Sequence, residues 1–535
     1  MKVNNFFLKH NNYIVCIFFI ILFAISWSQI EDYGVTLDDQ IYYLNGLNAY
    51  LYSKQLLLSF FSHESNLEQL RSKIEGWPVV FEMFLIFICD IFKIEQIEKV
   101  YLTAHRLNFI IFFSGLIIFY KLIQKRFNNI FFSLISVIFF ILSPRIFAES
   151  FYNSRDIFFM SLFIFYTFSG YSFINNKNLS NSIIFAFFTA LLINAKILGV
   201  IPFGIFCLLY LYNFTHTNKR FVQERRIILF YFLFCIFFIY IFWPFLWNNP
   251  FLNLLSAFID ILKTHENLII INHYFGNYMS SDMMPWHYRL MWFVITTPVS
   301  ILILLFGGLV VVSKKLLNVV NKSLDNNYQI NNKQFLDSFL FLVFFASFFV
   351  AAEFNKSKFG GWRHLYYVYP IVIYFAIYFI SFINISLLHI KFKFLIIFLI
   401  SSNLFYNLYW SIKNHPHQYI FFNFLSKNYS MKNFDLDWWG VSHKSSLEYI
   451  LKNDTSTSIK VFAEGFTSLK DSYLYLNKTD KSRVIITGFE DAKYVINNNK
   501  KRIRNNINLN TDDFELFYQL NIDGGNVTSI YKRKN

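Results

Sequence analysis

The sequence predicts an α-helical polytopic membrane protein, with about eleven transmembrane helices and a small C-terminal α/β domain. Three observations lead to this fold class. Hydrophobic residues make up 55% of the 535-residue chain, aromatic residues make up 22%, and the mean hydropathy is +0.39. Apolar runs near the ~20 residues that a membrane span needs recur through the first 410 residues. The remainder is more polar and contains short strand-like runs.

The apolar runs give the expected spans. A retained N-terminal anchor is favoured over a signal peptide, because no small-residue cleavage site precedes Glu31. The apolar segment 79–93 is short and contains Glu82 and Asp90, so we expect it to be re-entrant or interfacial. The expected spans are 13–29, 101–120, 129–145, 157–174, 181–194, 197–213, 227–247, 289–312, 337–353, 364–383 and 394–410.

The net charge of +15 is explained by basic loops between these spans, and we expect no nucleic acid partner. With the N-terminus in the cytoplasm, lysines and arginines from six regions all fall on the cytoplasmic side, as the positive-inside rule requires. These are Lys2, Lys9, Lys121, Lys125, Arg126, Lys177, Lys219, Arg220, Arg225, Arg226, Lys314, Lys315, Lys391 and Lys393. The protein is therefore expected in the inner or plasma membrane.

This orientation divides the chain into two expected domains. Residues 1–410 form the transmembrane domain, with a first extracytoplasmic loop over 30–100, and residues 411–535 form an extracytoplasmic domain. Within the second domain, β-branched and aromatic runs predict strands at 459–463, 484–487 and 494–496, and residues 445–451 read as a helix.

The remaining chemically unusual stretches gather on the extracytoplasmic side. Asp38 and Asp39 are adjacent carboxylates just after the first span, which are costly there unless they are paired, hydrated or used in chemistry. The alternative is that the pair caps a helix beginning near Leu37. The other stretches on this side are 143–156, 194–196, 273–289 and 353–364.

Several of these stretches resemble, in order, motifs of the GT-C class of polyprenyl-phosphate-dependent glycosyltransferases. Within that class, the chain resembles the bacterial branch of family 39, which includes the dolichyl-phosphate-mannose protein mannosyltransferases. Asp39 stands where that family usually has Glu, Ser154 where it has Pro, and Arg155 where it has Lys. The matching stretches are 38–39, 143–157, 285–298, 361–364 and 415–440, within a resemblance over most of 30–445.

The resemblance implies transfer of a hexose or pentose from a polyprenyl-phosphate donor to a lipid, glycan or protein acceptor. Such a reaction needs a base for the acceptor hydroxyl and cations for the leaving phosphate. Asp38 is the expected base, by its match to the family's first acidic position, and Asp39 would orient the acceptor or tune Asp38. Membrane lipids are the other expected partners.

Arg155, Lys196 and Arg363 are the candidate phosphate ligands, because arginine offers a planar fork of donors and lysine a point charge. Two of them have a structural alternative: Arg155 could pair with Asp156 to join two helices, and Lys196 could extend to the interface. Gly360 and Gly361 would permit close backbone approach beside Arg363.

Further possible substrate contacts are Arg145, Asp156, His287 and His364. For His287 a plain loop role is also open. The histidines and acids show no close metal-ligand spacing, and the four cysteines lie in apolar runs. We therefore expect no cofactor, with a divalent metal left open.

Two other classes of function compete with the transferase. A transporter or flippase of a lipid-linked saccharide would show inverted repeats and charges near the middle of its spans. The sequence shows no inverted repeat, and its charges lie at span ends on one face rather than near the middle of spans. A sensor with an extracytoplasmic domain leaves that charge cluster unexplained. The sequence therefore favours a lipid-dependent glycosyltransferase.

Overall fold

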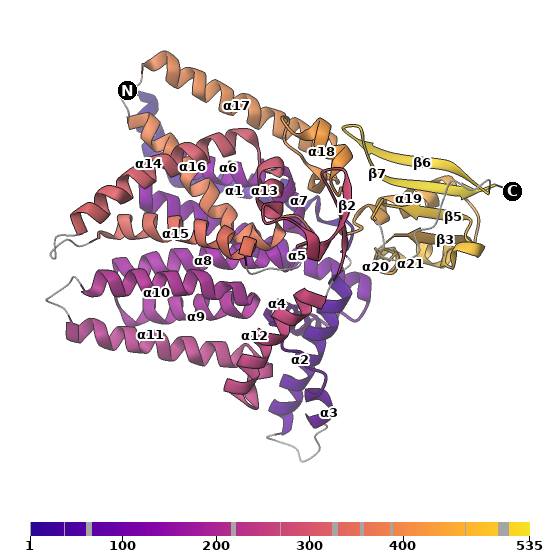
Figure 1. The fold of residues 1–535 in the computed structure, drawn as a ribbon, viewed down its shortest axis with the longest axis horizontal. Coiled ribbons are helices and arrows are strands. Elements are labelled where there is room, and N and C mark those ends of the chain that lie inside the picture. Colours follow the sequence, from indigo (N-terminus) through magenta and orange to yellow (C-terminus); the bar gives the residue numbers. More distant parts are fainter. Residues whose placement is uncertain are drawn as a thin grey trace.

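The computed structural model describes residues 2–36, 38–59, 67–215, 221–267, 269–323, 330–353, 358–385, 389–465, 467–500 and 513–534. Long helices run side by side through most of the molecule, and a small mixed domain lies at one end of them (Figure 1). The predicted fold class, a polytopic helical membrane protein with a C-terminal α/β domain, is confirmed.

The helical part begins with α1 (Lys2–Trp27), α2 (Asp39–Ser59), α3 (Leu67–Arg71), α4 (Val80–Ile91), α5 (Ile97–Phe127), α6 (Ile130–Ile141), α7 (Pro144–Tyr152) and α8 (Asp156–Asn175). It continues with α9 (Leu179–Ala195), α10 (Val200–Thr215), α11 (Phe221–Ile241), α12 (Pro250–Asn267), α13 (Tyr288–Thr296), α14 (Val299–Ser323), α15 (Asn332–Glu353), α16 (Tyr369–Ile385) and α17 (Ile390–Lys413). A short hairpin of β1 (Ile271–Tyr274) and β2 (Asn277–Ser280) interrupts it. Short 3-10 turns join several of these elements, and one of them, η5 (Arg363–Val368), leads into α16.

Seven segments among the described residues are long and apolar enough to cross a membrane, and the bent pair of α6 and α7 makes an eighth if it counts as one span. The expected spans at 181–194 and 197–213 form shorter apolar helices, and the one at 227–247 falls largely on α11. These three helices nevertheless pack into the same bundle, because α9 contacts both α8 and α11 while α10 contacts α15 (Figure 1). The seven segments are Asn12–Asp32, Ile97–Phe127, Asp156–Asn175, Val299–Lys322, Asn332–Ala352, Arg363–Ile383 and Ile390–Lys413.

Two expected spans were wrong as continuous helices, and both are broken at a proline. The segment 129–145 bends by 72° between α6 and α7, where Ser143 precedes Pro144 with extended backbone angles. The segment 289–312 divides into α13 and α14, where Thr297 is likewise extended before Pro298. Proline sterically disfavours the helical conformation of the preceding residue, which explains both breaks.

The C-terminal domain is built on a five-stranded sheet of order β4-β3-β5-β7-β6. The three predicted strands are confirmed as β3 (Ile459–Glu464), β4 (Val484–Ile486) and β5 (Tyr494–Asn497), and β3 pairs in parallel with the other two. The predicted helix lies within α19 (Ser442–Asn453), and three shorter helices complete the domain: α18 (Lys427–Asn433), α20 (Lys470–Tyr475) and α21 (Lys478–Arg483). The sequence prediction missed the antiparallel hairpin of β6 (Phe514–Ile522) and β7 (Gly525–Arg533), although Asp523-Gly524 at its tip is a strong hairpin signal.

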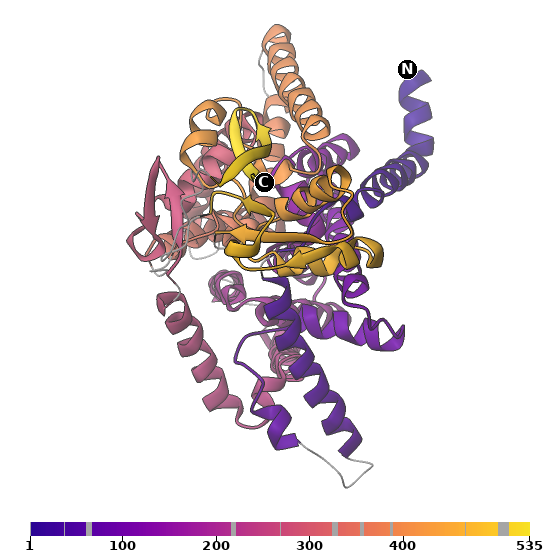
Figure 2. The same ribbon diagram turned by 90° about the vertical axis from the view of Figure 1, so that its right-hand side faces the viewer.

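Polar contacts fasten this domain to the helical part where α5 begins. Tyr101 donates a hydrogen bond to Asp471 Oδ1 at 3.2 Å, and Lys481 Nζ lies 3.4 Å from Glu98 Oε2. Lys444 Nζ donates to the backbone carbonyls of Glu31 and Asp32, which follow α1. Seen end-on, the domain therefore covers one end of the helices (Figure 2).

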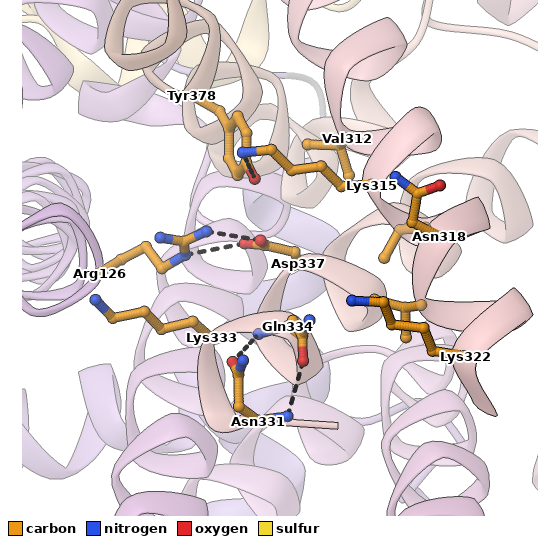
Figure 3. A pocket seen from close by; sticks show the side chains of 12 residues that line it. Arg126, Val312, Lys315, Asn318, Lys322, Asn331, Lys333, Gln334, Asp337 and Tyr378 are labelled. Atoms are coloured by element: carbon orange, nitrogen blue, oxygen red, sulfur yellow. Dashed lines mark hydrogen bonds and ion pairs between the residues drawn. The ribbon is translucent and has the colours of Figure 1, made fainter. Parts of the chain in front are cut away.

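The opposite end carries basic side chains from several helices. Arg126, in the last turn of α5, forms an ion pair with Asp337 of α15 at 2.7 Å (Figure 3). Lys121 and Lys125 lie on the same helix, and Lys314 and Lys315 lie on α14. Lys219 and Arg220 lie outside the described residues. This separation of the basic end from the C-terminal domain is the pattern expected of a cytoplasmic face opposite an extracytoplasmic one.

Single-cysteine labelling tests the predicted orientation. In a cysteine-free background, Glu448→Cys on the C-terminal domain should react with a membrane-impermeant maleimide added to intact cells, because the Glu448 side chain is 53% exposed. Lys314→Cys, at the basic end, should react only after the membrane is permeabilised. The reverse pattern would contradict the orientation and the face assigned to the site below.

Candidate active site

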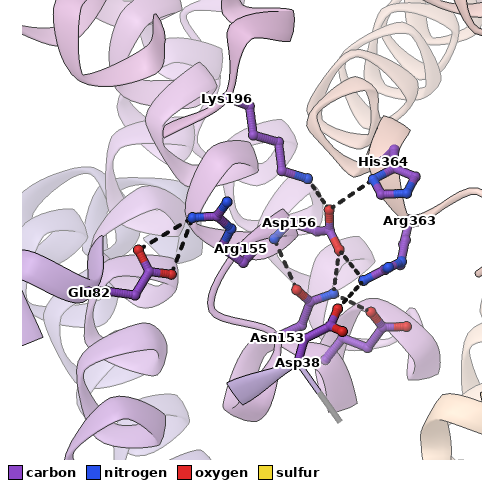
Figure 4. Close-up of polar contacts among 9 residues, drawn as sticks. Asp38, Glu82, Asn153, Arg155, Asp156, Lys196, Arg363 and His364 are labelled. Atoms are coloured by element: carbon purple, nitrogen blue, oxygen red, sulfur yellow. Dashed lines mark hydrogen bonds and ion pairs between the residues drawn. The ribbon is translucent and has the colours of Figure 1, made fainter. Parts of the chain in front are cut away.

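Asp156 and Arg363 lie at the centre of a network of charged side chains (Figure 4). The network lies at the end of the helices nearest the C-terminal domain, where Arg363 contacts Trp438 and Trp439. Asp156 is the first residue of α8, and its side chain is 1% exposed. Its Oδ1 accepts a hydrogen bond from the Lys196 ammonium and lies 3.8 Å from His364 Nδ1. Its Oδ2 lies 3.6 Å from Arg363 Nη1. Four residues that the sequence placed in three separate loops are thus in one contact group.

Asp38 completes this group from the first loop. Its Oδ2 accepts a hydrogen bond from Arg363 Nη1 at 3.3 Å, so a single guanidinium nitrogen serves both Asp38 and Asp156. The Asp38 side chain is 19% exposed, whereas those of Asp156 and Arg363 are 1% and 6% exposed. Asp38 is therefore the carboxylate of the pair that a ligand can reach.

The backbone of Asp38 also starts α2, because its carbonyl accepts the Tyr42 N–H at 3.1 Å. The helix begins at Asp39, and the expected start at Leu37 lies outside the described residues. The hydrogen bond described for the Asp38 side chain is with Arg363 rather than with a backbone N–H of the first helical turn. Burial raises the pKa of the Asp38 carboxyl, and the charge of Arg363 opposes this rise.

Two glycines set the position of Arg363. Gly360 and Gly361 have φ angles of +65° and +68°, which residues with a side chain seldom adopt. A Cβ atom on Gly360 would lie 2.6 Å from Arg363 Nε, so a side chain there would displace the guanidinium. The Gly361 N–H donates to the Tyr288 hydroxyl at 3.1 Å. The lack of a side chain at Gly360 therefore lets the Arg363 side chain pack directly against the backbone.

Aromatic rings from beyond the last span cover the guanidinium. Arg363 Cζ lies 4.1 Å from the ring centre of Trp439 and 4.6 Å from that of Trp438, at cation–π distance. Trp438 also stacks on Phe359, with ring centres 5.7 Å apart. Sequence reasoning placed the two tryptophans in a motif but not in the site, because nothing local links them to Arg363.

Arg155 is close to the network but is directed to its own partners. Its Nη1 donates to the carbonyl of Pro78 at 2.8 Å and lies 3.3 Å from Glu82 Oε1 of α4. Its guanidinium also lies over the ring of Tyr42 at 4.0 Å. This favours the structural interpretation of Arg155, with Glu82 rather than Asp156 as the direct partner. A carboxylate inside an apolar segment was the available signal for Glu82.

A second group of polar side chains lies behind Asp156. Asn153 Nδ2 donates to Asp156 Oδ2 at 3.0 Å and to Glu149 Oε2 at 2.7 Å, and Glu149 also accepts the Tyr366 hydroxyl at 2.6 Å. Arg145 donates from Nε to the Tyr419 carbonyl at 2.7 Å. The hydrogen bonds of Asn153 fix the orientation of Asp156, whereas Arg145 does not contact Asp156 directly.

Asp39 and His287 are turned to other partners. Asp39 Oδ2 accepts the Thr36 N–H at 2.7 Å. Burial raises the pKa of Asp39 to about 7; the hydrogen bonding of Thr36 lowers it, and the charges of Asp471 and Asp38 raise it. His287 Nδ1 shares a hydrogen bond with the Tyr274 hydroxyl at 2.9 Å, and its described contacts are with this aromatic neighbourhood rather than with the Asp156 network.

Within the described parts of the chain, no group of three or more histidine, cysteine or acidic side chains is placed to hold a metal ion.

Comparisons with known proteins found no matching family model and no matching curated protein. Among solved structures, the crystal structure of ArnT from Cupriavidus metallidurans in the apo state is similar, with 9% identity, 98% of each chain covered and a TM-score of 0.45. At this level of likeness, the site is interpreted from its own geometry.

The raised pKa of Asp39 predicts a pH-dependent stability. A carboxyl with a higher pKa in the folded state binds its proton more tightly there, so its contribution to stability is lost as pH rises through about 7. Between pH 5 and about 8, the melting temperature of the wild type should fall relative to that of Asp39→Asn, which does not titrate.

Tryptophan-fluorescence melting in detergent measures this difference across the pH series. Asp282→Asn, which removes an exposed acid, should keep the pH dependence of the wild type. Parallel melting curves for the wild type and Asp39→Asn at every pH would contradict the assignment.

Proposed function

We propose that the protein is a membrane glycosyltransferase that moves a sugar from a polyprenyl-phosphate donor to an acceptor hydroxyl at the extracytoplasmic membrane face. The observation that supports this most directly is the contact between the Asp38 carboxylate and the Arg363 guanidinium at 3.3 Å. A proton acceptor and a fixed cation side by side are what the two ends of a glycosyl transfer require.

Asp38 is assigned as the general base. In the proposed reaction it takes the proton of the acceptor hydroxyl, whose oxygen forms a bond to the anomeric carbon. The bond from that carbon to the donor phosphate oxygen breaks, and the phosphate leaves with the electron pair. A carboxyl pKa raised by burial suits this role, because a base works best with a pKa near the working pH.

Arg363 and Lys196 are assigned to the leaving phosphate. Both are held by Asp156, which is too buried to meet a substrate and therefore serves to orient the two cations. Asp38 and the donor phosphate would compete for the same guanidinium. Phosphate binding would then draw Arg363 from Asp38 and leave the carboxylate available to the acceptor. His364, 3.8 Å from Asp156, is a further candidate contact for the phosphate or the sugar.

The finer assignment rests on the resemblance of motifs 38–39, 143–157, 285–298, 361–364 and 415–440 to the bacterial branch of family 39. It makes a hexose or pentose the proposed sugar, and a lipid, glycan or protein the proposed acceptor. Arg145 would act from behind the site, through the polar group around Glu149. Arg155 is assigned to structure rather than to the phosphate, because Glu82 and Pro78 already engage it.

Asp38→Asn tests the proposed function. The variant keeps the size of the side chain but cannot accept the proton, so transfer should fall by about 10²–10⁴-fold. Asp39→Asn should reduce it less, since that side chain is turned to Thr36. Protein level should stay unchanged in both, because asparagine keeps the size of each side chain and its oxygen can still accept the hydrogen bond from Arg363 or from Thr36.

A strain that lacks the protein provides the assay. Mass spectrometry of its lipids and glycans identifies the sugar that is lost, and complementation with the wild type or each variant at matched protein level measures its return. Full restoration by Asp38→Asn would contradict the role of Asp38. Accumulation of an unflipped lipid-linked saccharide, with no defect in transfer, would instead favour a flippase.

A further inference from the structure

A basic cavity lies at the end of the bundle away from the candidate active site (Figure 3). It has a volume of about 350 Å³ and lies between α5, α14, α15 and α16. Four cations, Arg126, Lys315, Lys322 and Lys333, line it against one carboxylate, Asp337. The cavity therefore carries three positive charges in excess, which none of the residues assigned to sugar transfer explains.

The floor of the cavity is already charge-balanced. Arg126 holds Asp337 with two hydrogen bonds, from Nε to Oδ1 at 3.0 Å and from Nη2 to Oδ2 at 2.7 Å. The Tyr374 hydroxyl donates to the same carboxylate. These side chains are 13% and 7% exposed for Arg126 and Asp337, respectively. The carboxylate is thus fully engaged at the base of the cavity and does not neutralise the lysines around it.

Lysines from two helices surround this floor. The Lys315 ammonium donates to the Tyr378 hydroxyl at 3.0 Å and lies over its ring, and the Arg126 guanidinium lies over the same ring. Lys322 and Lys333 reach the cavity from the ends of α14 and α15 (Figure 3). Among the described residues, none of the three ammonium groups lies within ion-pair distance of a carboxylate. Three cations that line one cavity, and that have no acidic partner in the described parts of the chain, are the composition of an anion site.

One wall of the cavity is apolar, and the helix that forms it has exposed apolar side chains on another face. Val312, Leu316 and Val319 of α14 line it. On the outer side of the same helix, Leu317 is 62% exposed and Val320 is 56% exposed, as expected of side chains that meet lipid. An apolar wall next to clustered lysines matches a ligand with both a phosphate and hydrocarbon chains.

This cavity is separate from the candidate active site. Asp156 begins α8 within the site, and Asn175, the last residue of α8, accepts a hydrogen bond from Asn332, next to Lys333. The 20 residues of α8 therefore separate the two regions. At a rise of ~1.5 Å per residue, this is about 30 Å, roughly the thickness of the hydrocarbon core.

We infer that this cavity binds the phosphate of an anionic phospholipid headgroup in the membrane leaflet at the basic end. Lys315, Lys322 and Lys333 contact the phosphate, and the acyl chains lie along the α14 surface at Leu317 and Val320. The inference does not depend on sugar transfer.

Lipid binding to the purified protein tests it. Native mass spectrometry of delipidated protein titrated with phosphatidylglycerol or phosphatidylcholine gives the affinity for each. The wild type should prefer phosphatidylglycerol. The triple variant Lys315→Gln, Lys322→Gln and Lys333→Gln should bind it about tenfold or more weakly, because each lysine near an anionic headgroup contributes to the attraction.

The matched control is the triple variant Lys121→Gln, Lys314→Gln and Lys391→Gln. It removes the same charge from exposed lysines outside the cavity lining and should bind within about twofold of the wild type. Equal losses in the two triple variants, or no preference in the wild type, would overturn the inference. Full displacement of phosphatidylglycerol by millimolar inorganic phosphate would assign the site to free phosphate and overturn the lipid assignment.

Discussion

One nitrogen of Arg363 lies 3.3 Å from a carboxylate oxygen of Asp38 and 3.6 Å from one of Asp156, and the rest of the site is arranged around it. Burying such charges costs several kcal/mol per ion unless each is paired, and removal of one partner leaves the other uncompensated. Lys196 supplies the second cation that Asp156 needs. The network therefore connects the first loop, α8, the turn before α10 and the segment before α16 through charge rather than through local sequence.

The surrounding fold serves this arrangement. Positive φ angles at Gly360 and Gly361 bring the guanidinium to the carboxylates, and Trp438 and Trp439 cover it from the C-terminal side. The break before Pro144 begins α7, which carries Arg145 and Glu149 to the polar group behind Asp156. The break before Pro298 follows the end of α13, where Thr296 accepts a hydrogen bond from Trp362 beside Arg363. The C-terminal domain contributes directly to the covering of the site, so its place at this end has a physical reason.

The sequence predicted the parts of this picture that depend on local pattern. Hydropathy found most of the apolar helices, and period and composition found β3, β4 and β5. Position at the span ends on one face, together with the resemblance to family motifs, marked Asp38, Asp156, Lys196 and Arg363. Partner choice was not predictable, because it depends on packing between distant segments. Arg155 pairs with Glu82, and His287 hydrogen-bonds Tyr274, because folding brings these residues together and their spacing along the chain does not show it. The two proline breaks and the hairpin at Asp523-Gly524 were local signals that the hydropathy pattern obscured.

Each end of the bundle has an arginine paired with aspartate, but the two contacts differ. At the Arg126–Asp337 pair the carboxylate is saturated by donors from α5 and α16, which is typical of a structural contact. At Arg363 the contacts to two carboxylates are longer, and Asp38 is partly open. A saturated pair resists exchange, whereas a shared and partly open cation can pass from a carboxylate to an incoming phosphate. This difference supports placing the chemistry at Arg363.

The direct test of this coupling is a double-mutant cycle on Asp38 and Arg363, read as the rate of sugar transfer at matched protein level. Because the two side chains are in contact and are assigned to one step, the Asp38→Asn, Arg363→Ala double variant should be little slower than the slower single variant. The coupling free energy should then lie in the range of about 0.5–3 kcal/mol or above that is found for residues in contact. Two single losses that simply multiply in the double variant would contradict a shared role for the pair.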